Sequence, residues 1–345
     1  MDGTDNKTKL GANAILALSM LICRIAAAKK QVPLFRHIND LVNLKYTEKV
    51  SPCMPYMFFN VLNGGKHADN VMVCQEIMFS VITEGANVGE MLERASTVFH
   101  CLKDNIKAIG ESSNVGDEGG FAPNITPEQG VELILKSAGD AQVGSDVRIA
   151  FDFAASEFEL SDKPGTYDFN FKKKGDKKAQ LKSEEELLAY YVDLLGKYKQ
   201  IVSLEDPFSE NGSAYFSKIT AKVDPKQCQI VADDLTCTNK KVIEKCVANK
   251  EANSLLVKMN QIGTVTETIE ACHTAKLAGW SLMVSHRSGE TNDDFAADLA
   301  VGLGAEAVKF GAPSRGERVA KYNRLQRIHS TNEDLKLSYH SFKGI

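Results

Sequence analysis

Residues 201–233 read IVSLEDPFSENGSAYFSKITAKVDPKQCQIVAD, and this stretch decides the fold class. It begins with an apolar run at 201–204 that ends at Glu205, and it closes with a second apolar run at 230–232 that ends at Asp233. The residues between the two runs are numerous enough for one helix. An apolar strand, a helix and a second apolar strand form the repeating unit of an α/β protein with a parallel sheet.

The same unit recurs through the second half of the chain, from about residue 147. Six apolar runs there each end in a residue that can take part in chemistry, namely Asp152, Glu205, Asp233, Lys258, His286 and Lys309. In an α/β barrel each parallel strand delivers the side chain at its carboxyl end to the same rim. We therefore expect the six residues to meet at one rim.

Two more strands are predicted ahead of these six, at 54–60 and 74–80, and a glycine turn follows the first. Helices are predicted at 87–109 and 127–139; Thr126, Pro127 and Gln129 mark the start of the second. The order becomes ββαα(βα)6, with eight strands. Eight strands that alternate with helices close into a barrel, so we predict an α/β fold of the TIM-barrel type.

Three segments lie outside this pattern. Residues 8–30 predict one long helix that is apolar on almost every turn and needs cover on most sides. Residues 31–50 show no clear period and are expected as a loop. Residues 161–182 are polar and lysine-rich, and we expect a surface hairpin or loop there. Helix starts are predicted from three capping pairs, which are Ser183 with Glu186, Thr264 with Glu267, and Ser314 with Glu317.

Composition indicates a soluble globular protein, with 345 residues, 43% apolar residues and 25% charged residues. The net charge of −4 gives no reason to expect nucleic acid or an anionic membrane as a partner. The eight cysteines form no C-x-x-C pair, which favours free thiols in a reducing compartment. Charged residues precede the apolar stretch at 12–23, and that stretch is too short for a bilayer, so we expect a packed helix and a cytoplasmic protein.

Three of the strand-end residues are carboxylates that we expect at neighbouring strands: Asp152, Glu205 and Asp233. Three carboxylates on one rim repel one another unless a cation joins them. Oxygen ligands with room for water suit Mg²⁺ better than zinc, which prefers nitrogen and sulfur. The alternative is that each is a helix cap or a surface group, which requires a coincidence at three successive strand ends.

Lys258 ends a strand of apolar residues and is therefore expected to be partly desolvated. Nearby cations would lower its pKa further, so that it could act as a base. The alternative is a purely structural ion pair with Asp233.

Residues 284–289, VSHRSG, bring an imidazole, a guanidinium and a hydroxyl together where we expect a helix to begin. His286, Arg287 and Ser288 with a helix N-terminus behind them would suit a phosphate group. Lys309, one strand further on, adds another cation.

Further candidates lie in the first half of the chain. The segment NVGDEGG at 114–120 places Glu118 among glycines that let the backbone approach a ligand, so Glu118 could be an acid. Glu76 on the second strand is another candidate carboxylate. His67 follows a glycine pair, and a single histidine on a loop is more often exposed than catalytic.

Together these motifs resemble one family, the enolases, which act on 2-phosphoglycerate in glycolysis. The segments that carry the resemblance are KLGANAI at 9–15, NGGKHA at 63–68, GDEGG at 116–120, SLEDP at 203–207, ADDL at 232–235, KMNQIGT at 258–264, SHRSGE at 285–290 and KFGAP at 309–313. The resemblance extends from residue 2 to about residue 328.

This resemblance implies a hydro-lyase that uses Mg²⁺ and interconverts 2-phosphoglycerate and phosphoenolpyruvate. It implies that the metal is held by Asp152, Glu205 and Asp233. It implies that Lys258 takes the C2 proton and that Glu118, assisted by Glu76, protonates the leaving C3 hydroxyl. The substrate contacts that it implies are His67, Glu76, His286, Arg287, Ser288 and Lys309, with Lys309 at the carboxylate and Arg287 and Ser288 at the phosphate.

The sequence also departs from the family. Enolases have a further N-terminal segment, which forms most of a small α+β domain, bears a loop that helps bind a second Mg²⁺ and contributes to a homodimer contact. The present sequence starts after it, so we expect residues 1–50 to be a helical remnant of that domain, residues 51–345 to form the catalytic barrel, and the homodimer to be weakened. In the loop that closes over substrate, Lys66 and Asp69 stand where Ser and Gly are usual.

Two functions are therefore expected from the sequence. The first is a working phosphopyruvate hydratase. The alternative is an enolase-like protein with weak or no turnover that acts in binding or structure.

Overall fold

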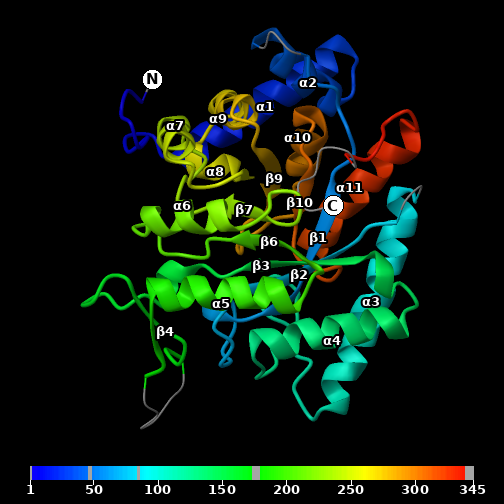
Figure 1. The fold of residues 1–345 in the computed structure, drawn as a ribbon. Coiled ribbons are helices and arrows are strands. Elements are labelled where there is room, and N and C mark those ends of the chain that lie inside the picture. The colour runs from blue at the N-terminus through cyan, green and yellow to red at the C-terminus, as the bar shows by residue number, and fades with distance from the viewer. Residues whose placement is uncertain (1, 46–48, 84–85, 173–178, 339–345) are drawn as a thin grey trace.

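Eight strands form a closed barrel in the computed structural model, which describes residues 2–45, 49–83, 86–172 and 179–338 (Figure 1). In order around the barrel they are β1 (Tyr56–Asn63), β10 (Ala307–Lys309), β9 (Ser281–Ser285), β8 (Ser254–Val257), β7 (Gln229–Ala232), β6 (Ile201–Glu205), β3 (Val147–Asp152) and β2 (Glu76–Val81). Of these eight, β2 alone runs antiparallel to both of its neighbours. The predicted ββαα(βα)6 order and the TIM-barrel class are confirmed.

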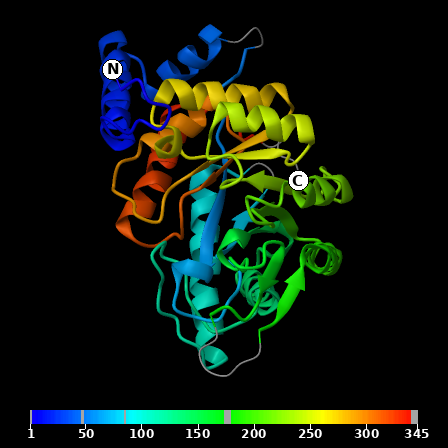
Figure 2. The same ribbon diagram turned by 90° about the vertical axis from the view of Figure 1, so that its left-hand side faces the viewer.

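Helices cover the outside of the barrel, as two views at right angles show (Figures 1 and 2). They are α3 (Val88–Ala108), α4 (Pro127–Asp140), α5 (Glu184–Lys197), α6 (Ser213–Lys222), α7 (Lys240–Asn249), α8 (Met259–Ile262), α9 (Val265–Leu277), α10 (Phe295–Leu303) and α11 (Gly316–Thr331). The helices α3 and α4 lie within about two residues of their predicted bounds. The predicted capping box at the start of α4 is present.

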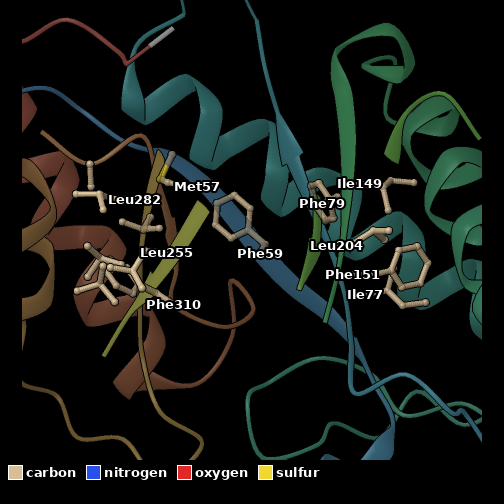
Figure 3. Close-up of a cluster of buried hydrophobic side chains, with 14 of the residues drawn as sticks. Met57, Phe59, Ile77, Phe79, Ile149, Phe151, Leu204, Leu255, Leu282 and Phe310 are labelled. Carbon is tan, nitrogen blue, oxygen red and sulfur yellow. The ribbon is translucent and has the colours of Figure 1, made fainter. Parts of the chain in front are cut away.

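The strands are buried on both faces, and their side chains alternate between two apolar layers. One layer lies between strands and helices and includes Phe59, Ile77 and Phe151 (Figure 3). The other takes at least one residue from each of the eight strands, so it fills the barrel interior; its members on the strands are Tyr56, Phe58, Met78, Ala150, Val202, Val231, Leu256, Met283 and Ala307. This period of two decides which strand-end side chains point inward.

The N-terminal region contains two helices, α1 (Ala12–Lys30) and α2 (Leu34–Lys45). The prediction of a loop at 31–50 was wrong, because Phe35, Ile38 and Val42 form one buried helical face that packs on α10.

The cover that the apolar helix at 8–30 needs is only partly supplied by the rest of the described chain. Leu18 is 60% exposed and Ile22 is 64% exposed, and Leu21 and Ile25 are exposed beside them. Among the described residues α1 is the one helix that is long and apolar enough to cross a membrane, with 19 residues and 17% of its tested window buried. One such helix near a chain start is weak evidence for a span.

The exposed face of α1 leads to a first prediction. Replacing Leu18 and Ile22 together by glutamine should reduce self-association, since burying each such side chain contributes about 1.5–3 kcal/mol. Light scattering over a concentration series measures this. Leu277→Gln is the control, because Leu277 is 70% exposed on α9. Equal association of the double variant and the unmodified chain would show that the α1 face is not responsible.

The insertion at 161–182 contains a two-stranded antiparallel sheet formed by β4 (Thr166–Asp168) and β5 (Leu181–Ser183). The predicted hairpin is thus confirmed for its base, and residues 173–178 of it lie outside the described part.

Two of the three predicted helix caps in the second half of the chain are present. Ser183 caps α5, and the Thr264 side chain accepts a hydrogen bond from the backbone of Glu267. Ser314 does not cap α11, because the helix begins at Gly316 and Arg315 is the residue at the N-cap position.

Candidate active site

Six predicted strand-end residues lie at the same rim of the barrel. Asp152, Glu205 and Lys309 are the last residues of β3, β6 and β10. Asp233, Lys258 and His286 immediately follow β7, β8 and β9. Four of the six stand two positions after an interior residue and so share its inward face: Asp152 after Ala150, Asp233 after Val231, Lys258 after Leu256 and Lys309 after Ala307.

Glu76 reaches this rim because β2 is reversed. It is the first residue of β2, yet it pairs in register with Asp152 at the end of β3. A pocket of about 170 Å³ opens at this rim, lined by His67, Gln75, Glu76, Glu118, Asp152, Ala154, Glu157, Asp206, Asp233, Asp234, Lys258, Ser285, His286, Arg287, Ser288 and Lys309. The structure therefore brings the predicted site residues together around one cavity, and Glu205 joins them through Lys309.

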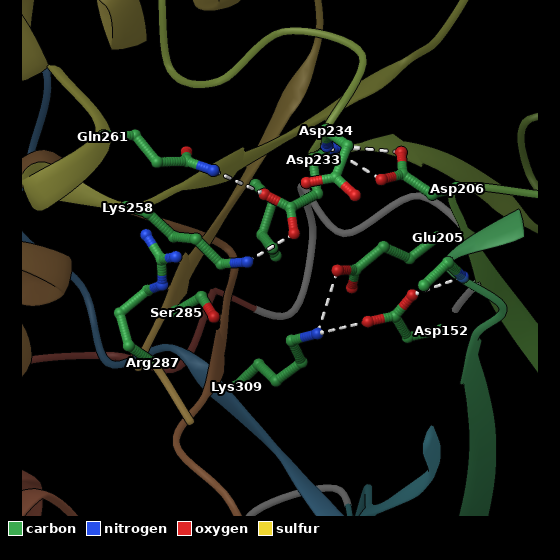
Figure 4. A network of polar contacts seen from close by, with 12 residues as sticks. Asp152, Glu205, Asp206, Asp233, Asp234, Lys258, Gln261, Ser285, Arg287 and Lys309 are labelled. Carbon is green, nitrogen blue, oxygen red and sulfur yellow. Dashed lines mark hydrogen bonds and ion pairs between the residues drawn. The ribbon is translucent and has the colours of Figure 1, made fainter. Parts of the chain in front are cut away.

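Lys309 lies among three buried carboxylates (Figure 4). Its Nζ is 3.1 Å from Glu76 Oε2, 3.1 Å from Asp152 Oδ2 and 2.9 Å from Glu205 Oε1. Burial opposes the charge on this ammonium, but the carboxylates of Asp152 and Glu205 hold the pKa of Lys309 well above its ordinary value. Lys309 is thus a permanent counter-ion for the carboxylate cluster.

Asp233 is held by Lys258, whose Nζ forms an ion pair with Oδ2, and by Gln261, whose Nε2 donates to Oδ1 at 3.1 Å (Figure 4). Burial acts to lower the pKa of Lys258, but the Asp233 carboxylate outweighs it and raises that pKa above its ordinary value. The prediction that the pKa of Lys258 is lowered was therefore wrong. The reason is that Asp233 lies closer to the ammonium than any neighbouring cation does.

Asp152, Glu205 and Asp233 present carboxylate oxygens at one rim of the barrel and could hold a divalent cation. They come from three adjacent strands, because β3, β6 and β7 are neighbours in the barrel. Glu205 Oε2 is buried and has no hydrogen-bond partner among the described residues. Burial, followed by the Asp152 carboxylate, raises the pKa of Glu205 well above its ordinary value. A buried oxygen without a donor is a position that a cation would satisfy.

The loop after β7 is fixed by Asp206, a residue that sequence reasoning missed. Its two carboxylate oxygens accept hydrogen bonds from the backbone N–H groups of Asp233, at 3.0 Å, and Asp234, at 2.7 Å (Figure 4). Asp206 follows Glu205 directly, so the SLEDP segment supplies one carboxylate to the cluster and a second to the loop that carries Asp233. The adjacent acidic residues at 205–206 are the sequence feature that could have identified Asp206 as part of the site.

Glu118 lies on another side of the pocket, buried among hydrogen-bond donors. Asn60 Nδ2 donates to Oε2 at 2.6 Å, Ser288 Oγ donates to Oε1 at 3.1 Å, and His286 Nε2 lies 3.2 Å from Oε2. Burial alone would raise the pKa of Glu118, but His286, assisted by His67 and Lys309, holds it well below its ordinary value. Asn60 was missed because it lies inside an apolar strand.

Glu76, the second carboxyl group, favours the protonated form, whereas Glu118 favours the ionised form. Burial, followed by the neighbouring Glu118 carboxylate, raises the pKa of Glu76 well above its ordinary value. His67 Nδ1 lies 3.6 Å from an oxygen of each of these two carboxyl groups, and its Nε2 lies 2.9 Å from Ser288 Oγ. His67 is therefore mostly buried and faces the pocket, contrary to the expectation of an exposed loop histidine. The pair Glu76 and Glu118 can hold one proton between them.

The loop 286–289 differs from its prediction in one respect. The next helix in the sequence, α10, begins only at Phe295, so the loop does not lead directly into a helix. Arg287 is exposed, and its Nη1 donates to Asn260 Oδ1 at 3.0 Å. The imidazole, guanidinium and hydroxyl of this loop nevertheless all line the pocket.

The loop that contains Lys66 and Asp69 is held by Glu157, which lines the pocket, and by Lys172. Residues Gly65–His67 form a short 3-10 helix, and Lys66 within it makes an ion pair with Glu157. Lys172, from the inserted segment, donates to the carbonyl oxygens of Gly65 and Ala68.

The chain was compared with known proteins. It matches the family model described as enolase, C-terminal TIM barrel domain, over residues 51–342, and the model described as enolase, N-terminal domain, over residues 1–38. "Enolase B" of Dictyostelium discoideum is 48% identical over 344 residues, which cover 98% of this chain and 75% of that protein. "Enolase" of Solanum lycopersicum is 46% identical over 336 residues, which cover 95% of this chain and 73% of that protein. "Enolase 2" of Hevea brasiliensis is 45% identical over 337 residues, with the same two coverages of 95% and 73%.

Proposed function

Because this chain belongs to the enolase family of lyases, we propose that it interconverts 2-phosphoglycerate and phosphoenolpyruvate as a phosphopyruvate hydratase. The observation that carries the proposal is that a lysine, a pair of neighbouring carboxyl groups, a carboxylate cluster and several cations line one pocket. A reaction that removes a proton and expels a hydroxyl from an anionic substrate needs these groups.

Asp152, Glu205 and Asp233 would hold Mg²⁺, and the bound ion would supply positive charge to the substrate carboxylate. The orphaned buried oxygen of Glu205 supports this assignment. Lys309 would add a second positive charge at the substrate carboxylate. Its buried position among the same carboxylates keeps it protonated throughout.

Lys258 would take the proton from C2. To do so it must be neutral, and its ion pair with Asp233 opposes this. Once the Asp233 carboxylate is engaged as a ligand, its hold on Lys258 weakens, and burial together with the charge on Lys309 favours the neutral amine.

Glu118 would protonate the C3 hydroxyl as it leaves, with Glu76 as the neighbouring carboxyl group that stores the proton. Arg287, Ser288, His286 and His67 would contact the phosphate. A phosphate dianion beside Glu118 would raise the pKa of this group and so favour its protonated form. The imidazoles that hold Glu118 ionised in the free protein would then be shared with the phosphate.

Family membership also suggests a pathway, a compartment, a domain organisation and an oligomeric state for this chain. We place the reaction in glycolysis and gluconeogenesis in the cytoplasm, with residues 1–50 as part of an N-terminal domain and residues 51–345 as the catalytic barrel. A homodimer is proposed from the same family membership.

The direct test is an absorbance assay for phosphoenolpyruvate with 2-phosphoglycerate and Mg²⁺. Turnover that stops when EDTA is added supports the proposal. Calorimetric binding of 2-phosphoglycerate without turnover would instead support an enolase-like binding protein.

Lys66 provides a prediction about the loop over the pocket. Lys66→Ser should raise KM for 2-phosphoglycerate by up to about fivefold, because an exposed ion pair contributes about 0.2–1 kcal/mol. Steady-state kinetics measure the change. Glu157→Gln is the matched variant, since it breaks the same pair but keeps the lysine charge. If KM rises only for Lys66→Ser, the effect comes from the positive charge of Lys66. If KM is unchanged in both variants, the ion pair between Lys66 and Glu157 has no role in substrate binding.

A further inference from the structure

The guanidinium of Arg318, on α11, is buried behind the pocket and donates to four acceptors. Its Nη1 donates to the carbonyl oxygen of Arg287 at 2.6 Å and lies 2.6 Å from His286 Nδ1. Its Nη2 donates to the carbonyl oxygens of Asp117, at 3.1 Å, and Ser288, at 2.6 Å. Arg318 therefore contacts the residue before Glu118, the His286 ring and the two residues after His286. It does not line the pocket itself.

These contacts determine which nitrogen of His286 carries a proton. A guanidinium only donates hydrogen bonds and is not deprotonated in proteins. The Nδ1 atom of His286 must therefore accept, and the proton must lie on Nε2, which faces Glu118 Oε2 at 3.2 Å. Burial lowers the pKa of His286, and the Arg318 cation acts in the same direction, against the Glu118 carboxylate. The neutral imidazole thus places its Nε2 proton on the side that faces the proposed acid, Glu118.

Gly311 leaves the space through which the Arg318 side chain reaches these loops. Gly311 has φ +90°, and a Cβ atom at this position would lie 2.8 Å from Arg318 Cδ and 2.9 Å from the Glu118 carbonyl oxygen. The next residue, Ala312, donates its N–H to that same carbonyl oxygen at 3.0 Å. The segment after β10 therefore packs closely against both the Arg318 side chain and the backbone of the loop that carries Glu118.

We propose that Arg318 is a positioning residue for the reaction: it sets the His286 tautomer whose Nε2–H faces Glu118, and it ties the loop carrying Glu118 to the loop carrying His286 and Ser288. The part about turnover rests on the proposed function, and the part about the tautomer does not. Lysine at this position would keep the charge but could not reach four acceptors with the planar fork of a guanidinium.

The first measurement is the tautomer of His286 in the unmodified chain without substrate. The chain has seven histidines, so long-range ¹H–¹⁵N spectra of ¹⁵N-histidine-labelled protein remain countable, and His286→Asn identifies the signal. We expect the proton on Nε2. A proton on Nδ1 would overturn the proposal whether or not any variant folds and whether or not the protein turns over 2-phosphoglycerate.

The second measurement compares Arg318→Lys with Arg324→Lys. Arg324 is a matched control, because it also lies on α11 and its guanidinium also makes two hydrogen bonds, at 2.7 and 2.8 Å, but to Asp298 on α10. Arg318→Lys should mix the His286 tautomers and lower kcat about 100-fold, as expected for small misplacements of catalytic groups, with a much smaller change in KM. Arg324→Lys should lower only the melting temperature.

The outcomes separate the possible roles. If Arg318→Lys lowers the melting temperature as Arg324→Lys does, but keeps kcat and the His286 tautomer, Arg318 is merely structural and the proposal is overturned. If the unmodified chain has no turnover yet the tautomer changes in Arg318→Lys, the proposed function fails while the positioning of His286 by Arg318 stands.

Discussion

Lys258→Ala is expected to lower kcat for 2-phosphoglycerate by about 10²–10⁴-fold, the range found when a general base is removed. The residue follows β8 directly, is mostly buried, lines the pocket and forms an ion pair with Asp233. A water molecule in its place would have to remove the C2 proton without an amine of suitable basicity. The phosphoenolpyruvate absorbance assay measures the loss.

The control for this variant is Lys245→Ala, because Lys245 is exposed on α7 and does not line the pocket. Binding of 2-phosphoglycerate in the presence of Mg²⁺ should survive in Lys258→Ala, since the carboxylates and the loop at 286–288 are unchanged. Calorimetry tests this point. Retention of more than about a tenth of the original kcat would remove Lys258 from the role of base.

Asp152→Asn should weaken Mg²⁺ binding by more than about 100-fold, because the loss of an outer partner alone costs a metal site about 10–100-fold. Asparagine keeps the shape of the side chain and removes one negative charge from the cluster around Lys309. In the unmodified chain, Mg²⁺ at 100 times its Kd should stabilise the fold by about 2.7 kcal/mol. The same concentration should shift the melting temperature of Asp152→Asn hardly at all.

Asp162→Asn is the matched control, because Asp162 is exposed in the inserted segment and does not line the pocket. Calorimetric titration with Mg²⁺ gives the affinities directly, and a thermal melt with and without Mg²⁺ gives the stabilisation. If Asp152→Asn and Asp162→Asn bound Mg²⁺ equally well, the carboxylate cluster would not be the metal site.

The barrel and its rim could be predicted from the sequence because both depend on local patterns. Each strand is a short apolar run, and its last residue lies at the rim whatever the rest of the chain does. The helix α2 was missed although Phe35, Ile38 and Val42 have helical spacing and Pro33 precedes the helix. Its polar residues obscured a periodicity that was present.

The remaining site features depend on contacts between distant parts of the chain. Arg318 binds the carbonyl oxygen of Asp117, which is 201 residues away, and nothing near Arg318 in the sequence indicates this. The raised pKa of Lys258 arises from Asp233, 25 residues away, and its sign depends on which charge lies closest. Strand ends predict which side chains meet, but the charges they carry depend on distances that only the folded chain sets.

The position of Lys309 also bears on the order in which such a protein matures. Three carboxylates buried at one barrel end would resist folding if they had to wait for a divalent ion. Lys309 is covalently part of β10 and contacts Glu76, Asp152 and Glu205 as soon as the barrel closes. The polypeptide thus carries its own cation for these three carboxylates, so closing the barrel does not depend on a divalent ion.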